Sequence, residues 1–283
     1  VIAPIMEAQF IETAILNILN HQSLIATKAA RICYAAEGDG IMEFGLRRAQ
    51  GPDAGIYGAR AAVIGGCAGT SNVLTGQMFD VPVMGTHAHS WIMSFDDEYT
   101  AFYTYARLYP MACTLLVDTY DTLNSGVPNA IKVFKQMKNE GIELKNYGIR
   151  LDSGDLAYLS KKARKMLDDA GFKDATITAS NDLDEFLIAS LKMQGAEITN
   201  WGVGTNLITS KDCPSFGGVY KLAAIMEDGE NFTPKIKLSD NSEKITNPGN
   251  KKIYRIYEKE NNKIKADLIC LENETFTENE DMH

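Results

Sequence analysis

Residues able to do chemistry follow short apolar runs in this chain, and two histidines give the clearest case. The stretch GTHAHSW, residues 85–91, comes directly after Val81-Pro82-Val83-Met84 and holds two of the four histidines. If the apolar run is a strand, alternation of side chains turns His87 and His89 to the same side. An imidazole can act there as a nucleophile or a proton carrier, and a purely structural role also fits.

Other polar groups occur at equivalent places along the chain. Parallel α/β folds carry their chemistry at the carboxyl ends of the strands, so these groups are compared as one set. The set contains arginines, carboxylates, an imidazole and glycine-rich turns, which suits a phosphorylated substrate bound with Mg²⁺. Its members are residues 43–48, His87 and His89, Asp118 and Asp121, Arg150, Asp152 and Asp155, residues 180–182 and residues 202–205.

Two of these places could bind a phosphate. Asp182 with Glu185 fits a capping box at a helix start, and a capped helix start also offers free N–H groups to an anion. Gly202 and Gly204 near a strand end could serve close packing alone. The last strand-to-helix loops of a barrel often bind phosphate, and Thr205 adds a hydroxyl, so phosphate binding is slightly favoured here.

The acidic and aromatic members leave more than one interpretation open. Arg150 and Asp152 fall on the same side of an extended run, where they could form an ion pair or face a ligand, while Asp155 could cap the next helix. Asp118 ends an apolar run and could bind metal, orient a histidine or cap a helix. Phe44 could be ordinary core.

The elements needed to position these residues alternate between strand and helix patterns. Six apolar or β-branched runs are each followed by a helical pattern, which predicts parallel strands with crossover helices in a barrel or a doubly wound sheet. Gly141 and Gly171 are placed to end two of the helices. The expected strands fall within 40–46, 81–87, 112–118, 146–152, 175–180 and 196–204, and the expected helices within 55–69, 96–109, 127–141, 155–171, 183–195 and 217–225.

The two ends of the chain differ from this pattern. Residues 7–33 show helical spacing of apolar residues, which predicts one or two amphipathic helices. Beyond about Asp228, short strands broken by Asn, Pro and Gly turns predict an antiparallel β appendage. The predicted division is therefore a helical lead-in over 1–30, an α/β domain carrying the site over 31–228 and a β-rich part over 229–283.

Composition limits the class of function. The chain has 283 residues and a formal net charge of −9, which disfavours binding to nucleic acid or to anionic membranes. The five cysteines show no C-x-x-C spacing, so we expect a reducing cytoplasmic setting without a zinc site or a disulfide framework. No apolar run is long enough to span a bilayer, and the first residues show no signal-peptide pattern.

Eight motifs in order, from about residue 3 to residue 256, resemble the nicotinate phosphoribosyltransferase family. The resemblance implies an incomplete TIM-type (β/α) barrel of the type II phosphoribosyltransferase kind, with part of an open-faced β sandwich to which both chain ends contribute. It also implies a homodimer with active sites near the subunit interface. The motifs are MEFGLRRAQGPDAG, GTSNVL, GTHAHSW, VDTYDT, RLDSGD, ASNDLDE, WGVGTNL and FGGVYKL.

The same resemblance implies a reaction. Family members join nicotinate to 5-phosphoribosyl 1-pyrophosphate, giving nicotinate mononucleotide and pyrophosphate in NAD salvage, and couple this to ATP hydrolysis through a phosphohistidine. By position, His89 is the phosphorylated histidine and His87 its neighbour. Asp118 and Asp152 orient His89 or hold Mg²⁺, and ATP is a co-substrate.

The resemblance assigns substrate-binding roles as well. Phe44 stacks on the pyridine ring, Arg150 faces the carboxylate or the ring of nicotinate, and Arg47 stabilises the leaving pyrophosphate. The remaining assignments are Lys221 as a second pyrophosphate cation, Arg48 and Lys244 as helpers, backbone N–H groups near Asn181, Gly204 and Thr205 for the 5-phosphate, and Ser180 and Gly202 as further substrate-binding residues.

One position bears on substrate choice. Related nicotinamide-using enzymes carry an aspartate where this chain has Ser71; a carboxylate there accepts from an amide and repels a second carboxylate, so Ser71 favours nicotinate. Ser71 could instead simply cap the next helix. The alternative functions are a nicotinamide phosphoribosyltransferase and a non-catalytic ligand-binding module. The second is considered because a tyrosine-containing segment near the family's N-terminus has no match here. We also expect the family's C-terminal part to be absent beyond Phe276.

Overall fold

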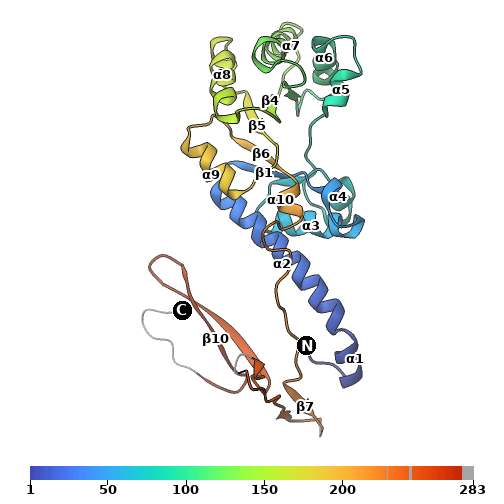
Figure 1. Cartoon of the computed structure of the whole chain (residues 1–283), viewed down its shortest axis with the longest axis vertical. Coiled ribbons are helices and arrows are strands. Elements are labelled where there is room, and N and C mark those ends of the chain that lie inside the picture. The colour runs from blue at the N-terminus through green and yellow to red at the C-terminus, as the bar shows by residue number, and fades with distance from the viewer. Residues whose placement is uncertain (228, 242–243, 276–283) are drawn as a thin grey trace. The chain divides into compact units, whose positions relative to one another are not determined.

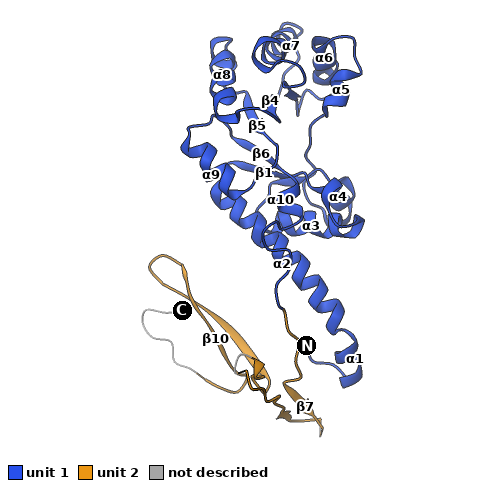
Figure 2. Ribbon diagram, viewed as in Figure 1, with its two compact units in different colours: residues 1–217 blue, residues 218–283 orange. Residues whose placement is uncertain are grey.

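The computed structural model describes residues 1–227, 229–241 and 244–275. The chain divides into two compact units, Val1–Gly217 and Gly218–His283, which Figure 2 distinguishes by colour. Each unit is described by itself below. The predicted ranges 1–30, 31–228 and 229–283 stay predictions.

The first unit is built on a parallel six-stranded sheet (Figure 1). The strand order is β2-β1-β6-β5-β4-β3, so the first strand pairs with the last and the sheet follows the chain around an open barrel. This confirms the predicted α/β class with an incomplete barrel. The strands are β1 (Gly40–Glu43), β2 (Gly69–Thr70), β3 (Thr114–Leu116), β4 (Gly148–Leu151), β5 (Thr176–Ala179) and β6 (Asn200–Val203).

The barrel is open between β2 and β3, and residues 82–87 cross this gap. Thr70 donates to the carbonyl of Pro82 (3.0 Å) and accepts from the N–H of Met84 (2.9 Å), which forms a single bridge to Val83. On the other side, the His87 ring nitrogen Nε2 accepts from the N–H of Leu116 (3.3 Å). A main-chain bridge and an imidazole thus replace a strand in this place.

The strand predicted within 81–87 is therefore wrong. Pro82 has no N–H to donate to a ladder, and only one bridge forms. Because the segment is not a strand, His87 and His89 do not share a side. His87 is buried against β3, whereas His89 is the first residue of helix α5 (His89–Met93).

Helices cover the sheet, and most lie where the pattern predicts. Helix α8 contacts β4 and β5, and α2 and α3 contact β1, while α6 packs on α7 and α9 packs on α2 (Figure 1). The bounds are α1 (Ile5–Phe10), α2 (Glu12–Ala35), α3 (Pro52–Ile64), α4 (Val73–Phe79), α6 (Glu98–Leu108), α7 (Val127–Asn139), α8 (Leu156–Asp169), α9 (Glu185–Met193) and α10 (Thr205–Ile208), with a 3₁₀ turn η1 (Leu46–Arg48) and a π turn η2 (Thr122–Gly126).

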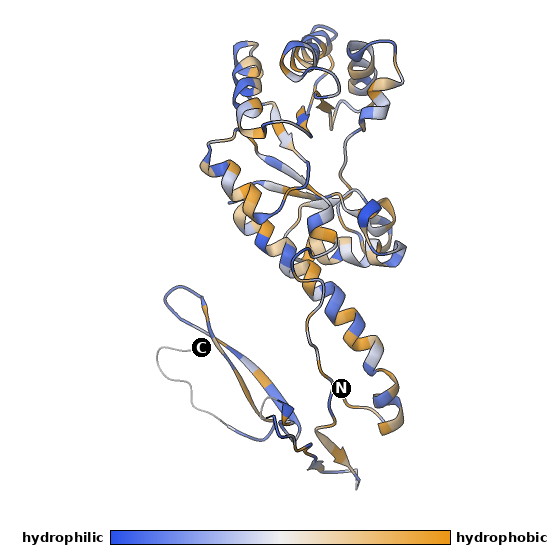
Figure 3. Ribbon diagram, viewed as in Figure 1, coloured by the Kyte–Doolittle hydropathy of each residue, from blue (hydrophilic) through white to orange (hydrophobic). Residues whose placement is uncertain are grey.

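The core forms where these helices meet the sheet. Ala59, Ala61 and Ala62 of α3 are buried, and small side chains let α3 approach α2 closely. Figure 3 shows apolar and hydrophilic residues interspersed along α2, of which Ile25 and Ile32 are buried. In the described part of the chain, no helix is both long and apolar enough to cross a membrane.

The observed helix ends can be compared with the residues predicted to cap or end each helix. Gly141 and Gly171 follow α7 and α8 at φ +74° and +91°, and Asp155 caps α8, all as predicted. The capping box at Asp182 is wrong. The side chain of Asp184 caps α9, and Asp182 lies outside the helix at φ +41°.

The helix predicted within 217–225 is also wrong. Residues 217–223 are irregular, and β7 (Ala224–Met226) follows. The pair Gly217-Gly218 has low helix propensity, which explains why the apolar spacing after it does not form a helix. The helix that does follow β6 is α10, within the glycine-rich motif itself.

The second unit contains antiparallel strands, as predicted. Strand β7 pairs with β8 (Phe232–Pro234), and β9 (Lys251–Tyr257) pairs with β10 (Ile264–Leu271) in a hairpin. Lys221 and Lys244 belong to this unit, where Lys221 Nζ donates to the carbonyl of Lys244 (2.8 Å).

Candidate active site

Arg150 joins three segments at the carboxyl end of the sheet. It lies in β4, and its Nη1 donates to Thr86 Oγ1 (2.7 Å) in the segment that crosses the barrel gap. Its Nε donates to Ser180 Oγ (2.8 Å) just after β5, and its Nη2 to Asp152 Oδ1 (2.9 Å). The predicted Arg150–Asp152 ion pair is present, and three polar partners fix the plane of the guanidinium.

Asp152 is the anionic partner in this group. Burial opposes its ionisation, but a hydrogen bond from Ser180 and the Arg150 guanidinium together hold the pKa of the Asp152 carboxyl below its usual value. Asp152 is therefore charged at neutral pH. The Ser180 hydroxyl is engaged between Arg150 and Asp152, which makes it part of the support for these charges.

His89 lies beside this pair, at the start of α5. Its Nδ1 is 3.0 Å from Thr119 Oγ1, and its Nε2 is 3.9 Å from Asp118 Oδ1 and 3.7 Å from Asp152 Oδ2. The His89 side chain is 38% exposed, so a ligand can reach the ring. The structure thus brings together the three residues predicted as His89 and its carboxylates.

Asp118 is almost fully buried, at 2% exposure of its side chain. Its Oδ2 accepts from the N–H of Asp152 (2.8 Å) and from Ser153 Oγ (2.6 Å), whereas its Oδ1 has no hydrogen-bond partner among the residues that the structure describes and is turned toward His89. The helix-capping alternative for Asp118 is excluded, because Asp121 caps the turn that follows.

Asp118 and Asp152 are the carboxylates predicted to hold Mg²⁺. Asp118 Oδ1, a buried oxygen without a hydrogen-bond partner among the described residues, and Asp152 Oδ2 lie 3.9 and 3.7 Å from His89 Nε2. Among the described residues no group of three or more His, Cys, Asp or Glu side chains is arranged to hold a metal. Mg²⁺ commonly takes only one or two carboxylates and completes its shell with waters and substrate phosphates, so a pair suffices.

Phe44 occupies the same end of the sheet, next to Arg150. The guanidinium carbon of Arg150 lies 5.6 Å from the ring centre of Phe44. A Cβ added to Gly202 would come within 2.6 Å of that ring, so glycine is required for the ring to pack on β6. The structure places Phe44, Arg150 and Gly202 together, although Phe44 directly follows β1 and the other two lie in β4 and β6.

The loops after β5 and β6 are the predicted phosphate site. Asn181 has φ +100°, and Gly204 precedes the short helix α10. Asn206 ties the two loops together, since its Nδ2 donates to the carbonyls of Asp182 (2.8 Å) and Leu183 (3.0 Å). Asn181, Gly204 and Thr205 are thereby held in neighbouring loops.

Two arginines and a serine complete the predicted set in this unit. Arg47 and Arg48 are exposed on η1, and neither forms an ion pair or a side-chain hydrogen bond with any residue that the structure describes. They are free to bind an anion. Ser71 does not cap α4, since the side chain of Asn72 does, so the helix-capping alternative for Ser71 is excluded.

Several residues that support the site were missed by sequence reasoning. Thr86 holds Arg150, Thr119 holds His89, Ser153 holds Asp118 and Asn206 joins the phosphate loops. Each lies in or beside a motif already singled out in the sequence, and this position was the one sign that it could belong to the site. Their partners are distant in the chain, which spacing does not reveal.

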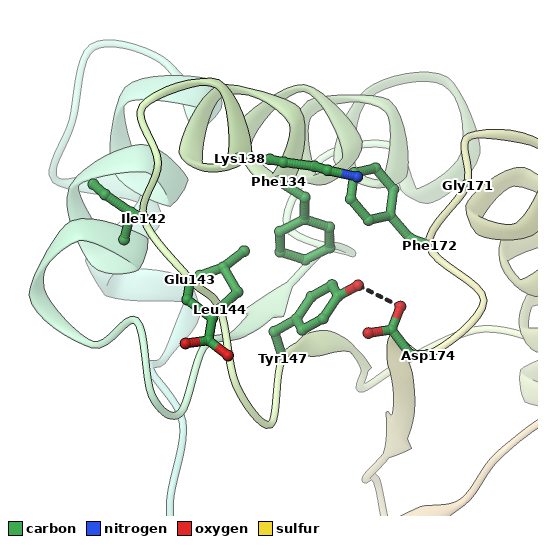
Figure 4. Close-up of a pocket in the computed structure, with 9 residues that line it drawn as sticks. All are labelled: Phe134, Lys138, Ile142, Glu143, Leu144, Tyr147, Gly171, Phe172 and Asp174. Carbon is green, nitrogen blue, oxygen red and sulfur yellow. Dashed lines mark hydrogen bonds between the residues drawn. The ribbon is translucent and has the colours of Figure 1, made fainter.

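Two cavities elsewhere in the first unit contain none of the predicted site residues. One, of about 250 Å³, lies at the amino ends of β4 and β5, where Tyr147 donates to Asp174 (2.6 Å) beside Phe134 and Phe172 (Figure 4). The other, of about 410 Å³, lies between α2, α9 and residues 210–216. The predicted site is separate from both.

Comparison with known proteins gives consistent results. Residues 40–270 match the family described as "Nicotinate phosphoribosyltransferase (NAPRTase) family". A nicotinate phosphoribosyltransferase of Bacillus subtilis is 57% identical over 272 residues, which cover 96% of this chain and 54% of that protein. The human nicotinate phosphoribosyltransferase is 33% identical over 89% of this chain and 56% of that protein.

Solved structures agree on the fold. The crystal structure of human nicotinic acid phosphoribosyltransferase matches with a TM-score of 0.79 and 30% identity, over 97% of this chain and 61% of that one. A nicotinate-nucleotide pyrophosphorylase from Pyrococcus furiosus matches with a TM-score of 0.68 at 24% identity, which concerns the fold alone. The chain spans about half the length of the curated relatives it matches.

Proposed function

Because this chain belongs to the nicotinate phosphoribosyltransferase family, we propose that it carries the catalytic barrel of an enzyme joining nicotinate to 5-phosphoribosyl 1-pyrophosphate. The products are nicotinate mononucleotide and pyrophosphate, and ATP hydrolysis is coupled to the reaction through a phosphohistidine. One observation carries the proposal. Arg150 contacts both Phe44, on the side proposed for the ring, and Asp152, which faces His89.

His89 is proposed as the phosphoryl acceptor. Two carboxylates near Nε2 favour a proton on that nitrogen, which leaves the lone pair on Nδ1, directed at the Thr119 hydroxyl. Nδ1 attacks the γ-phosphorus of ATP, so an N–P bond forms and the P–O bond to ADP breaks. The positive charge that develops on the ring is stabilised by Asp118 and Asp152.

Phosphoribosyl transfer is proposed to take place on the other side of Arg150. Phe44 presents an aromatic face to the pyridine ring, and Arg150 offers a guanidinium to its carboxylate. The pyridine nitrogen bonds to the ribose C1 as the bond from C1 to pyrophosphate breaks. Little proton transfer is needed, so stabilisation of the leaving group dominates.

Charges for that leaving group are proposed to come from Arg47 and Arg48. The roles of Lys221 and Lys244, which belong to the second unit, stay predictions. Mg²⁺ held by Asp118 and Asp152 would neutralise phosphate charge. The 5-phosphate is proposed to lie on the loops of Asn181, Gly204 and Thr205, with Ser180 and Gly202 supporting them. The homodimer and the cytoplasmic location stay predictions.

Nicotinate is preferred to nicotinamide in this proposal because of Ser71. We expect Ser71→Asp to raise the ratio of kcat/KM for nicotinamide to that for nicotinate by about tenfold, since a carboxylate accepts from an amide and repels a carboxylate. Steady-state assays with both substrates measure the ratio. An unchanged ratio would contradict this basis for substrate choice.

The proposed function is tested by nicotinate-dependent release of pyrophosphate, with and without ATP. Labelled ATP should give an acid-labile, base-stable label on His89. A folded protein that releases no pyrophosphate and takes no label would favour the alternative of a non-catalytic ligand-binding module.

A further inference from the structure

Glu43 is a fully buried carboxylate directly next to Phe44. It is the last residue of β1, and its exposure is 0%. The N–H of Gly45 donates to its Oε1, and Thr70 Oγ1 donates to its Oε2 (2.6 Å). No basic side chain forms an ion pair with it in the part of the chain that the structure describes. Burial raises the pKa of the Glu43 carboxyl, while its two hydrogen bonds oppose the rise.

A carboxylate buried without a basic partner costs free energy, which its two hydrogen bonds must offset. What the carboxylate does is connect two loops. Gly45 belongs to the loop that carries Phe44, Arg47 and Arg48, and Thr70 precedes the loop that carries Ser71.

The second loop is tied to the same group through further bonds. Thr70 Oγ1 also accepts from the N–H of Asn72 (3.0 Å), and Asn72 Oδ1 caps α4 by accepting from the N–H of Thr75 (3.2 Å). The N–H of Ser71 donates to the main-chain carbonyl of Glu43 (2.9 Å). Glu43 therefore positions both the loop that carries Phe44 and the loop that carries Ser71.

The first loop has no room to adjust. A Cβ added to Gly45 would lie 2.8 Å from Glu43 Oε1 and 2.4 Å from Cβ of Ile208 in α10. Gly45 thus lies directly against both the Glu43 carboxylate and α10.

We infer that Glu43 is a positioning residue, which sets Phe44 and Ser71 in the arrangement that receives the flat acceptor substrate. The inference rests on the proposed function. A carboxylate can accept from both donors at once, because each of its oxygens is an acceptor. An amide of the same size has one oxygen, so its N–H groups must face either the Gly45 N–H, where two donors would meet, or the Thr70 hydroxyl. In the second case the hydroxyl must accept a second hydrogen bond beside that from Asn72 and can no longer donate to residue 43.

The decisive variant is Glu43→Gln in the full chain. We expect the KM for nicotinate to rise about tenfold while kcat stays within about twofold, as for an interaction that acts on binding. ATP-dependent labelling of His89 without nicotinate should be unchanged, since the partners of His89 come from the segments after β3 and β4.

Glu98→Gln is the matched control. Glu98 is also buried, at 5% exposure, and also accepts two hydrogen bonds, from Ser125 Oγ (2.6 Å) and Asn129 Nδ2 (3.0 Å). Both are on Oε2, so the single oxygen of glutamine can keep them, whereas its N–H₂ would replace Oε1, which has no partner among the described residues. Neither partner is a predicted site residue. We expect Glu98→Gln to lower thermal stability and leave the KM for nicotinate unchanged.

A second pair keeps the test valid if Glu43→Gln does not fold. Thr70→Ser retains the hydroxyl that donates to Glu43, whereas Thr70→Val removes it with little change of shape. We expect Thr70→Val to raise the KM for nicotinate and Thr70→Ser to restore it. In the double variant, the effects of Glu43→Gln and Thr70→Val should be less than additive.

Two results would overturn the inference, and they can be told apart. An active wild type in which Glu43→Gln and Thr70→Val shift the KM no more than Glu98→Gln overturns the positioning role alone. A wild type with no nicotinate-dependent turnover overturns the proposed function and the inference with it.

Discussion

Strand β4 has two ends that are built by different means. At its carboxyl end, which we call the rim, Arg150 and Asp152 are held by directional hydrogen bonds to Thr86 and Ser180. At its amino end, which we call the floor, Tyr147 packs in edge contact with Phe134 and Phe172, with ring centres 5.0 and 6.2 Å away. The same strand thus supplies chemistry at one end and packing at the other, as parallel α/β barrels commonly do.

This difference between rim and floor predicts which substitutions affect binding or chemistry and which affect stability. At the rim, most partners come from separate segments and each bond fixes an angle, so a change there should alter binding or chemistry first. At the floor, rings fill volume, so a change there should lower the free energy of unfolding and leave the chemistry intact. The following four experiments test this division.

The largest effect is expected at the rim, from His89→Gln. Without the imidazole there is no nucleophile for the γ-phosphate, so we expect loss of the acid-labile label and a fall of at least about a thousandfold in phosphoryl transfer. Labelled ATP measures it. Glutamine keeps polarity and size, and the melting temperature should stay close to that of the wild type. Retained labelling would show that the phosphoryl acceptor is another residue.

The next largest effect belongs to the floor. Phe172→Ala removes a buried ring from contact with Phe134 and Tyr147 and should cost about 3 kcal/mol of unfolding free energy. Denaturant titration measures the loss. In the fraction that stays folded, kcat/KM should be unchanged, and a selective rise in the KM for nicotinate would break the division between rim and floor.

His87 gives a stricter test of the comparison between rim and floor, because it lies near the rim but is buried and contributes to packing. Burial, the largest cause, lowers the pKa of His87 to about 4, so the folded protein keeps the ring neutral while the unfolded chain takes up a proton near pH 6.5. Its contribution to stability is therefore fully present above pH 6.5 and is lost progressively as the pH falls toward 4.

The matched variant for this prediction is His87→Leu, which cannot titrate. The difference in unfolding free energy between wild type and His87→Leu should change by at most about 3 kcal/mol between pH 7 and pH 4. The wild type should become less stable relative to the variant as the pH falls. Denaturant titrations at several pH values measure it. A difference that does not depend on pH would contradict the neutral, buried state of His87.

The smallest effect is expected from Tyr147→Phe at the floor. This variant keeps the ring and removes only the hydroxyl that donates to Asp174, so we expect a loss of about 1 kcal/mol of unfolding free energy. Phosphoryl labelling and turnover should match the wild type. A loss of turnover larger than the loss of stability would show that the floor communicates with the rim.

Much of the first unit could be predicted from sequence because its signals are local. Alternating strand and helix patterns located α6, α7, α8 and α9, and positive-φ glycines ended two of them. Asp184 was missed in favour of Asp182, since both are aspartates before the same helix. Asp182 cannot cap α9 because its backbone is left-handed, at φ +41°. The amino-acid sequence does not reveal this backbone conformation.

The sequence predicted which charged and aromatic residues lie together at the rim, but it did not predict the residues that hold them in place. His89, Asp118, Asp152, Arg150 and Phe44 do meet at the rim. Their holders Thr86, Thr119 and Ser153 are short hydroxyl side chains, whose value depends on a partner far along the chain. Glu43 stood at the head of a motif, yet its burial and its two donors are properties of the folded molecule only.

The open seam between β2 and β3 has a mechanical consequence. Residues 82–87, which span this gap, are attached by the main-chain bridge to Thr70, by the His87 ring nitrogen and by the bond from Arg150 to Thr86, and they lead directly into His89. Thr86 precedes His89 by only three residues. A displacement of His89 would therefore act on the Arg150 guanidinium through a short stretch of chain.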